Sequence, residues 1–336
     1  MSGAVTAETA GAAFAELADA CIRALAPAAL AEVERIGGSF PGEVAVVALG
    51  KCGSREMTAR SDLDLMTLYR PEGPTSASSL KDWSAETFYA RFTQRLVAAL
   101  SAPTGEGGLY EVDLQLRPSG TSGPVAVSLK AFEGYYERQA ETWELLALTR
   151  ARVVWSSSPE FAAPASGAIE AALRRPRDAA ASAQDVLEMR ALMERERPPS
   201  GFWDLKLSPG GLVDVEFVAQ YLQIIHASQG GPLEVNTAAA LAALAGRGLI
   251  GAADAAALGA AWRLQQDLSQ LLKLALRDDA DPASEPAGFR RLLARAAGAR
   301  DFSALHKALA RSRERARAVF VAVLQSAGHT SARRRR

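Results

Sequence analysis

Two aspartates stand two positions apart in the segment Ser61-Asp62-Leu63-Asp64-Leu65, and leucines alternate with them. Successive side chains of a β-strand point to opposite faces, so Asp62 and Asp64 would share one face while the leucines enter a core. Two neighbouring carboxylates on a buried strand are costly unless a cation lies between them. Because oxygen-only ligands favour Mg²⁺ over zinc, the pair predicts a magnesium site.

A third carboxylate, Asp113, lies on a second alternating segment, residues 109–117, where apolar residues at 112, 114 and 116 alternate with polar ones. If this predicted strand neighbours the first, Asp113 completes a three-carboxylate cluster for two Mg²⁺ ions. Such a cluster binds a nucleoside triphosphate and activates an attacking hydroxyl. A lone Asp-x-Asp pair is common on solvated surfaces, but the combination favours metal-dependent nucleotidyl transfer.

Phosphate ligands are predicted just before the aspartates, in Gly50-Lys51-Cys52-Gly53-Ser54. The glycines would let the backbone approach phosphates closely, and Ser54 adds a hydroxyl donor. The segment is not a P-loop, because no glycine stands five residues before Gly50. Arg117, at the end of the third predicted strand, either steadies the triphosphate or acts as a charge partner for the aspartates.

Periodicity predicts the elements that position these residues. We expect a helix at 5–36, strands at 44–49, 62–69 and 109–117, and a helix at 83–100. From about residue 130 the pattern is helical almost to the end, so Arg150 and Arg152 are expected at a solvated helix end. The predicted fold class is α+β, with a catalytic domain at 1–155, an all-α helical bundle at 156–330 and a disordered basic tail at 331–336.

Composition excludes several classes of protein. The 336 residues carry 38 Lys and Arg against 38 Asp and Glu, which argues against bulk attraction to nucleic acid or membranes. Two cysteines and three histidines are too few for a disulfide framework or a Cys- or His-based metal site. Neither a secretory signal nor a long apolar span is visible, so we expect a cytoplasmic protein.

Three blocks of the sequence together resemble one family. They are VALGKCGSREMTARSDLDL, the stretch beginning YEVDLQLRPSGTSGP, and DLKLSPGGLVDVEFVAQYLQ. The chain resembles, over about residues 5–325, one half of the bifunctional glutamine synthetase adenylyltransferase/adenylyl-removing enzyme, more closely its C-terminal half. The resemblance implies a nucleotidyltransferase fold, a short mixed sheet flanked by helices, followed by a helical bundle. It also implies that Gly53, Ser54, Asp62, Asp64 and Asp113 occupy the family's motif positions.

The activity implied by the resemblance is transfer of AMP from ATP to a tyrosine hydroxyl of glutamine synthetase, with release of pyrophosphate. Asp62 and Asp64 would hold Mg²⁺, with Asp113 as a third ligand near the attacking oxygen, while Gly53 and Ser54 would hold the β,γ-phosphates. Lys206 is a further candidate phosphate ligand, although the family's loop arginine is missing after it. Glutamine synthetase, and a nitrogen-signalling regulatory protein, are the implied partners.

Two alternatives remain open. One is the reverse chemistry, phosphorolytic removal of AMP from adenylylated glutamine synthetase to give ADP; the other is a non-catalytic module that binds glutamine synthetase. The segment Asp214-Val215-Glu216-Phe217 matches the Asp-x-Glu-Phe pattern of the transferring half. Asp214 either faces the catalytic cleft or is an acid of the first helical turn, whereas Glu216 is expected to be the latter.

Overall fold

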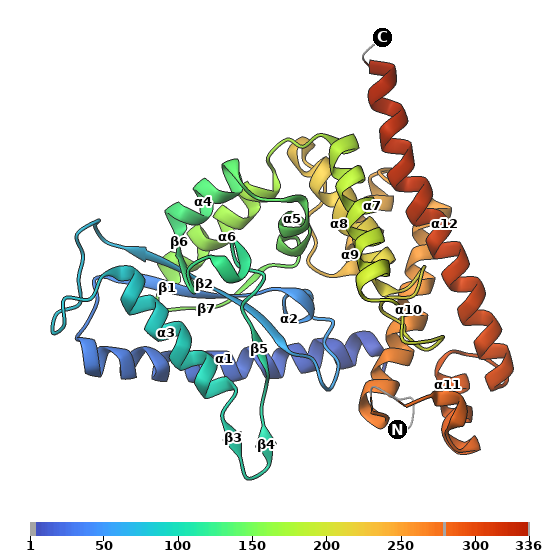
Figure 1. Cartoon of the computed structure of the whole chain (residues 1–336), viewed down its shortest axis with the longest axis horizontal. Coiled ribbons are helices and arrows are strands. Elements are labelled where there is room, and N and C mark those ends of the chain that lie inside the picture. The colour runs from blue at the N-terminus through green and yellow to red at the C-terminus, as the bar shows by residue number, and fades with distance from the viewer. Residues whose placement is uncertain (1–4, 278–279, 335–336) are drawn as a thin grey trace. The chain divides into compact units, whose positions relative to one another are not determined.

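A small mixed β-sheet organises the first half of the chain in the computed structural model (Figure 1), which describes residues 5–277 and 280–334. The residues fall into two compact units. The sheet unit comprises residues 12–57 and 61–175, and the helical unit comprises the residues up to 11, 58–60 and those from 176 onward. The mixed α+β class expected from the sequence is confirmed.

The sheet has the strand order β5-β2-β1-β7, and β6 also pairs with β2. Its strands are β1 (Gly42–Ala48), β2 (Leu63–Pro71), β5 (Val112–Asp113), β6 (Ala126–Ser128) and β7 (Arg152–Ser156). Strand β1 is antiparallel to β2 and β7, whereas β5 and β6 run parallel to β2. Strands β5 and β6 share one edge of β2, so β5 pairs with the beginning of β2 and β6 with its later residues.

Helices cover both faces of this sheet, which is why the strands are apolar on both faces (Figure 1). They are α1 (Ala7–Gly37), α2 (Gly50–Ser54), α3 (Ala85–Leu100), α4 (Leu129–Arg138), α5 (Thr142–Leu148) and α6 (Pro159–Leu173), with a 3₁₀ turn at Gly120–Ser122. One core joins α1 and α3 to β1 and β2, and α6 packs on β1 and β7. A small exposed hairpin, β3 (Pro103–Thr104) and β4 (Gly107–Gly108), follows α3.

The helical unit is built around α8, whose residues are mostly buried because α7, α9, α10 and α12 all pack against it. Its elements are α7 (Ala179–Glu196), α8 (Leu212–His226), α9 (Thr237–Gly246), α10 (Ala252–Ala275), α11 (Ala287–Ala296) and α12 (Phe302–Arg334), with 3₁₀ turns at Ala227–Gln229 and Pro282–Ser284. A leucine-rich cluster joins α10, α11 and α12. Within the described part of the chain, no helix has the length and apolar character needed to span a bilayer.

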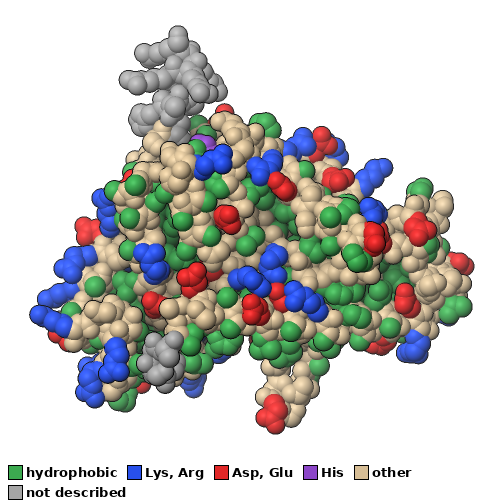
Figure 2. Space-filling model, turned by 180° about the vertical axis from the view of Figure 1, so that it is seen from behind, with side chains coloured by type: hydrophobic (Ala, Val, Ile, Leu, Met, Phe, Trp, Pro, Cys, Tyr) green, Lys and Arg blue, Asp and Glu red, His purple; other side chains and the backbone are tan. Residues whose placement is uncertain are grey.

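The surface carries both signs of charge, in keeping with the zero net charge of the sequence. Figure 2 shows basic and acidic side chains interspersed over one face of the molecule. A field of single sign that would attract a polyanion is therefore not visible on this face.

The structure corrects two predicted elements, and its compact units and last helix are bounded differently from the predicted domains. The predicted strand 109–117 is reduced to Val112–Asp113, because a turn follows directly. Strand β7 lies in a segment that was expected to be helical. Helix α6 packs on the sheet, so the sheet unit extends to Arg175 instead of ending at 155. Helix α12 continues to Arg334, so 331–334 are helical where a disordered tail was predicted, and 335–336 lie outside the described residues.

Candidate active site

Two of the three predicted carboxylates lie side by side on neighbouring strands. In the parallel pairing of β2 and β5, Leu63 is opposite Val112 and Asp64 is opposite Asp113. Directly opposed residues of neighbouring strands project to the same face of a sheet. The Asp113 Oδ1 accepts a hydrogen bond of 2.6 Å from the backbone N–H of Gln115, which fixes the orientation of that carboxylate.

Asp62 is exposed and immediately precedes β2. Among residues 5–277 and 280–334, no three His, Cys, Asp or Glu side chains converge closely enough to hold a metal ion. The register of β2 and β5 thus places Asp64 beside Asp113, Asp62 directly precedes β2, and the oxygen donors themselves are those that Mg²⁺ prefers.

The backbone of Gly50 lies directly against the Asp64 carboxylate. A Cβ at Gly50 would lie 1.9 Å from Asp64 Oδ2, and the residue has a φ of +50°. The neighbouring Leu49 N–H donates to the Asp64 carbonyl at 2.9 Å. Glycine is therefore required here for space and for conformation, and the turn after β1 forms one wall of the candidate site.

The next residues of that turn, Gly53 and Ser54, are buried. A Cβ at Gly53 would lie 2.0 Å from the Arg150 carbonyl oxygen, and the Ser54 hydroxyl donates to the Lys51 carbonyl at 3.4 Å. Gly50 and Lys51 are only partly buried. The residues assigned to phosphate from the sequence thus lie inside the sheet unit, and the more accessible part of the turn is its beginning.

Arg117 is buried and binds backbone carbonyls. Its guanidinium donates to the carbonyl oxygens of Leu114 at 2.6 Å, Pro124 at 2.9 Å and Gly123 at 3.1 Å. Burial lowers the pKa of Arg117, and the nearby Asp113 carboxylate opposes that shift. These three contacts hold the loop that follows β5.

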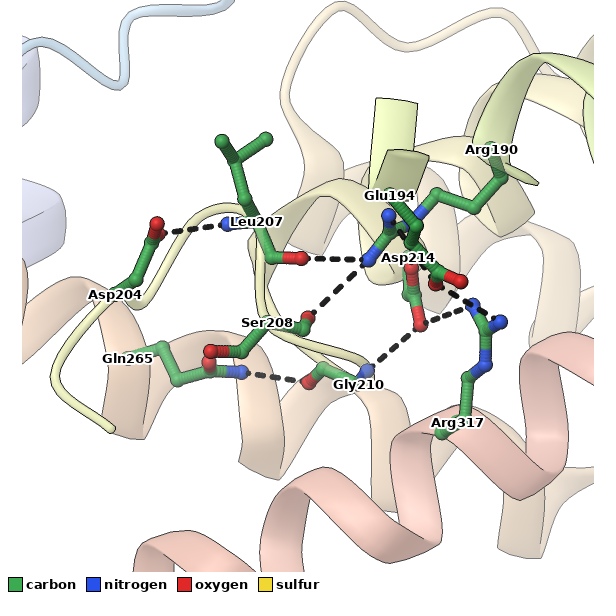
Figure 3. Close-up of polar contacts among 9 residues, drawn as sticks. All are labelled: Arg190, Glu194, Asp204, Leu207, Ser208, Gly210, Asp214, Gln265 and Arg317. Atoms are coloured by element: carbon green, nitrogen blue, oxygen red, sulfur yellow. Dashed lines mark hydrogen bonds and ion pairs between the residues drawn. The ribbon is translucent and has the colours of Figure 1, made fainter. Parts of the chain in front are cut away.

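Lys206 and Asp214 belong to the helical unit, and they differ in exposure. Lys206 is exposed in the loop before α8, whereas Asp214 is fully buried. Figure 3 shows Asp214 paired with Arg190 and with Arg317, the latter at 3.1 Å. The Asp214 Oδ2 also accepts the backbone N–H of Gly210 at 2.7 Å.

The same network holds the loop that carries Lys206 (Figure 3). Arg190 donates to the carbonyl oxygens of Leu207 at 2.8 Å and Ser208 at 3.4 Å. The Gln265 amide donates to the Gly210 carbonyl at 3.1 Å. Asp214 is therefore an interior acid that fixes this loop through Arg190 and Gly210, and Glu216 is half-buried two residues further along the helix.

Sequence reasoning missed a buried ion pair beside the turn. Arg152, expected at a solvated helix end, lies in β7 and forms a two-pronged contact with Asp19 of α1. Asp19 was overlooked because an acid in an Ala-rich helix is ordinarily solvated. The available signal was its position next to the apolar stripe that contains Ala15, Ala18 and Ile22.

Comparison with protein families points to one class of protein. The family model described as glutamate-ammonia ligase adenylyltransferase matches residues 1–167, and that described as GlnD PII-uridylyltransferase matches residues 187–324. Both descriptions denote enzymes that transfer a nucleotidyl group. The first match contains all three candidate aspartates, and the second lies in the helical unit.

Individual homologous proteins also indicate a nucleotidyltransferase. The bifunctional glutamine synthetase adenylyltransferase/adenylyl-removing enzyme of Caulobacter vibrioides is 67% identical over 325 residues, which is 97% of this chain and 33% of the relative. The enzymes of that name from Bradyrhizobium diazoefficiens and Xanthobacter autotrophicus are 42% identical over 340 residues and 45% over 332. The alignment with the Bradyrhizobium enzyme covers 99% of this chain and 34% of the relative. The alignment with the Xanthobacter enzyme covers 97% of this chain and 33% of the relative. The chain is strongly homologous to these adenylyltransferases and spans about a third of their length.

Replacing Gly50 with alanine tests the close approach to Asp64. We expect Gly50→Ala to lower the free energy of unfolding by about 1–2 kcal/mol, because the backbone is left-handed there and the new methyl group displaces the Asp64 carboxylate. Gly167→Ala is the matched control, since this exposed position in α6 has nothing within 4 Å of the added Cβ and gains helix propensity. Urea denaturation of both variants measures the difference. Equal stabilities would contradict the close approach.

Replacing Asp214 with asparagine tests its interior role. We expect Asp214→Asn to cost about 3 kcal/mol of unfolding free energy, because Arg190 would remain buried without its carboxylate. Glu216→Gln, two residues further along α8, removes the same charge from a half-buried position and should cost less than about 1 kcal/mol. Thermal and denaturant unfolding of the pair provide the measurement. An Asp214→Asn protein as stable as the wild type would show that the buried network contributes nothing.

Proposed function

We propose that this chain transfers AMP from ATP to a tyrosine hydroxyl of glutamine synthetase and releases pyrophosphate. The observation that carries the proposal is the pairing of Asp64 with Asp113, next to the Gly50 turn. Adjacent carboxylates beside a glycine-lined backbone suit a metal-bound triphosphate. The names of the homologous enzymes supply the substrate protein, glutamine synthetase.

Asp62 and Asp64 would hold Mg²⁺, with Asp113 as the third ligand. A bound Mg²⁺ would supply charge neutralisation at the triphosphate and polarisation of the α-phosphate. The exposed Asp62 directly precedes β2, so it would join the Asp64/Asp113 pair once a cation offsets the repulsion.

Asp113 would accept the proton of the attacking tyrosine hydroxyl. Its Oδ1 is already bonded to the Gln115 N–H, which presents the rest of the carboxylate in a fixed orientation. Arg117 would stabilise that geometry, because it fastens the following loop through the Leu114 carbonyl. In this role Arg117 positions the loop and keeps its guanidinium on the backbone carbonyls.

The β,γ-phosphates would be bound at the turn of Gly53 and Ser54. Because Ser54 is buried, its hydroxyl would have to exchange the Lys51 carbonyl for a phosphate oxygen when the nucleotide binds. The exposed Lys206 is proposed as a further phosphate ligand from the helical unit. The reaction would take place in the cytoplasm, where ATP is available.

We assign the chain to the transferring, C-terminal half of such an enzyme on the motif Asp214-Val215-Glu216-Phe217. The names of its relatives include adenylyl removal, so phosphorolysis of adenylylated glutamine synthetase is the second candidate. The helical unit matches a family named for PII-uridylyltransferase. That match supports a PII-type nitrogen-signalling protein as a possible regulatory partner.

Neutralising a metal-binding aspartate should abolish the reaction without unfolding the protein. We expect Asp64→Asn, and likewise Asp62→Asn, to lower the single-turnover rate about a thousandfold, equivalent to about 4 kcal/mol of transition-state stabilisation. The melting temperature should hold or rise, because repulsion between carboxylates is relieved. Glu72→Gln, an exposed acid beyond the other end of β2, is the matched control. Activity of Asp64→Asn within tenfold of the control would refute the metal assignment.

The direction of the reaction is decided with labelled substrates. We expect label from the α-phosphate of ATP to appear on unmodified glutamine synthetase in the presence of Mg²⁺, with release of pyrophosphate. Formation of ADP from adenylylated glutamine synthetase and inorganic phosphate, with forward labelling at background, would establish the removing activity instead. Binding of glutamine synthetase without Mg²⁺-dependent ATP binding or either reaction would establish the non-catalytic module.

A further inference from the structure

A fully buried carboxylate lies in α1, outside the proposed catalytic set. Asp19 is 0% exposed, and burial of a charge is costly unless it is paired and hydrogen-bonded. Arg152 of β7 supplies the pairing, with Nη1 at 2.7 Å from Oδ2 and Nη2 at 2.9 Å from Oδ1. Such two-pronged arginine–carboxylate contacts are strong and fix the guanidinium plane.

Two other arginines lie further from the Asp19 carboxylate. Arg23 and Arg55 approach Oδ2 at 3.6 Å and 3.8 Å, and their side chains are 56% and 42% exposed. The Arg152 side chain is 21% exposed and makes both short contacts. Arg152 is therefore the cation that Asp19 orients.

The same guanidinium binds the end of the short helix α2. Arg152 Nη2 donates to the Cys52 carbonyl at 3.1 Å, and Nε donates to the Gly53 carbonyl at 3.3 Å. The last carbonyls of a helix lack partners within the helix, and a helix of one turn gains little from cooperativity. The Cys52 carbonyl also accepts the backbone N–H of Arg55 at 3.3 Å, so Arg152 adds side-chain donors to a C-terminus that backbone bonds hold only in part.

The other end of α2 touches the candidate site. Gly50 lies against the Asp64 carboxylate, and the Leu49 N–H donates to the Asp64 carbonyl. Cys52 and Gly53, whose carbonyls Arg152 binds, stand two and three positions after Gly50 in α2. A change in the position of α2 would consequently move Gly50 relative to Asp64.

We propose that Asp19 and Arg152 are positioning residues for the nucleotide site. Asp19 orients Arg152, Arg152 holds the end of α2, and α2 sets the spacing between the Gly50 backbone and Asp64. The inference rests on the proposed function, because it assigns the pair to the alignment of that same site. Neither residue is assigned a contact with substrate.

The chain offers a matched control ion pair in the same sheet unit. Glu43 of β1 and Arg70 of β2 are register partners, and Arg70 Nε donates to Glu43 Oε2 at 2.9 Å. This pair lies at the end of β1 and β2 that is remote in the strand register from Asp64. Breaking it should remove stability without affecting α2.

The experiment compares Asp19→Asn and Arg152→Lys with Glu43→Gln in the full chain, below the melting temperature of each variant. Hydrogen–deuterium exchange is followed in peptides covering residues 50–57, and the Kd for ATP with Mg²⁺ and the adenylylation rate are measured. We expect Asp19→Asn to accelerate exchange in that segment selectively and to weaken nucleotide binding at least tenfold. Arg152→Lys should show exchange rates and a nucleotide Kd between those of Asp19→Asn and the wild type, because lysine keeps the charge but loses the planar guanidinium that binds two partners at once.

Two results would overturn the inference. The first is that hydrogen–deuterium exchange in residues 50–57 increases in Asp19→Asn and Arg152→Lys only as much as it does in the control Glu43→Gln. The other is an unchanged Kd and rate in both variants, which would make Asp19 and Arg152 an ordinary stabilising pair.

If Asp19→Asn does not fold, Arg152→Lys decides the question. If the wild type neither binds ATP nor transfers AMP in either direction, the proposed function fails, and the exchange data still decide whether the pair fixes the turn.

Discussion

The pairing of β5 with β2 places two like charges side by side, and it does so through only two residues of each strand. Neighbouring carboxylates raise the free energy of the folded state until a cation shares them. The rest of the sheet offsets this unfavourable free energy, because β2 is a long, buried strand that is hydrogen-bonded along β1 and also along β6. The stable part of the sheet thus supports a locally unfavourable pair, which is the pattern expected of a binding site.

Arginine side chains hold the irregular backbone around this pair and in the helical unit. Arg117 binds carbonyls of the loop after β5, Arg152 those of α2, and Arg190 those of the loop before α8. Arg313 binds the carbonyl oxygens of residues 202 and 204 in the same loop. Loops lack the regular ladder of hydrogen bonds, so their carbonyls need other donors when they are buried. The planar guanidinium, with five N–H donors, serves several carbonyls at once.

The sequence indicated the strand that carries Asp64 because its alternation of apolar and polar residues is regular, and it indicated Asp113 for the same reason. It could not show that the second strand stops at Asp113. The Asp113 carboxylate accepts a hydrogen bond from the Gln115 N–H and starts a turn there, and a side chain that bonds the nearby backbone in this way competes with strand pairing. The alternation of apolar and polar residues does not reveal that competition. Strand β7 was missed because five residues between helices have no decisive period. The Arg150 carbonyl packs against Gly53, next to the buried Ser54, and no local pattern encodes this contact between distant segments.

Under the proposed function, the three aspartates and the Gly50 turn would serve AMP transfer and AMP removal equally well, because both reactions break a bond at the α-phosphate. A residue that distinguishes them must therefore act elsewhere. The resemblance places Asp214 in the Asp-x-Glu-Phe motif of the transferring half, yet its carboxylate is occupied by Arg190, Arg317 and the Gly210 N–H. Its influence would pass through the loop that these contacts hold, which carries the exposed Lys206. A glutamate at that position would be one methylene longer in a fully buried network, so it would have to shift either Arg190 or the loop backbone. Within the helical unit the motif thus fixes a loop and its cation, and its buried acid is engaged in that network instead of serving as a reactive acid.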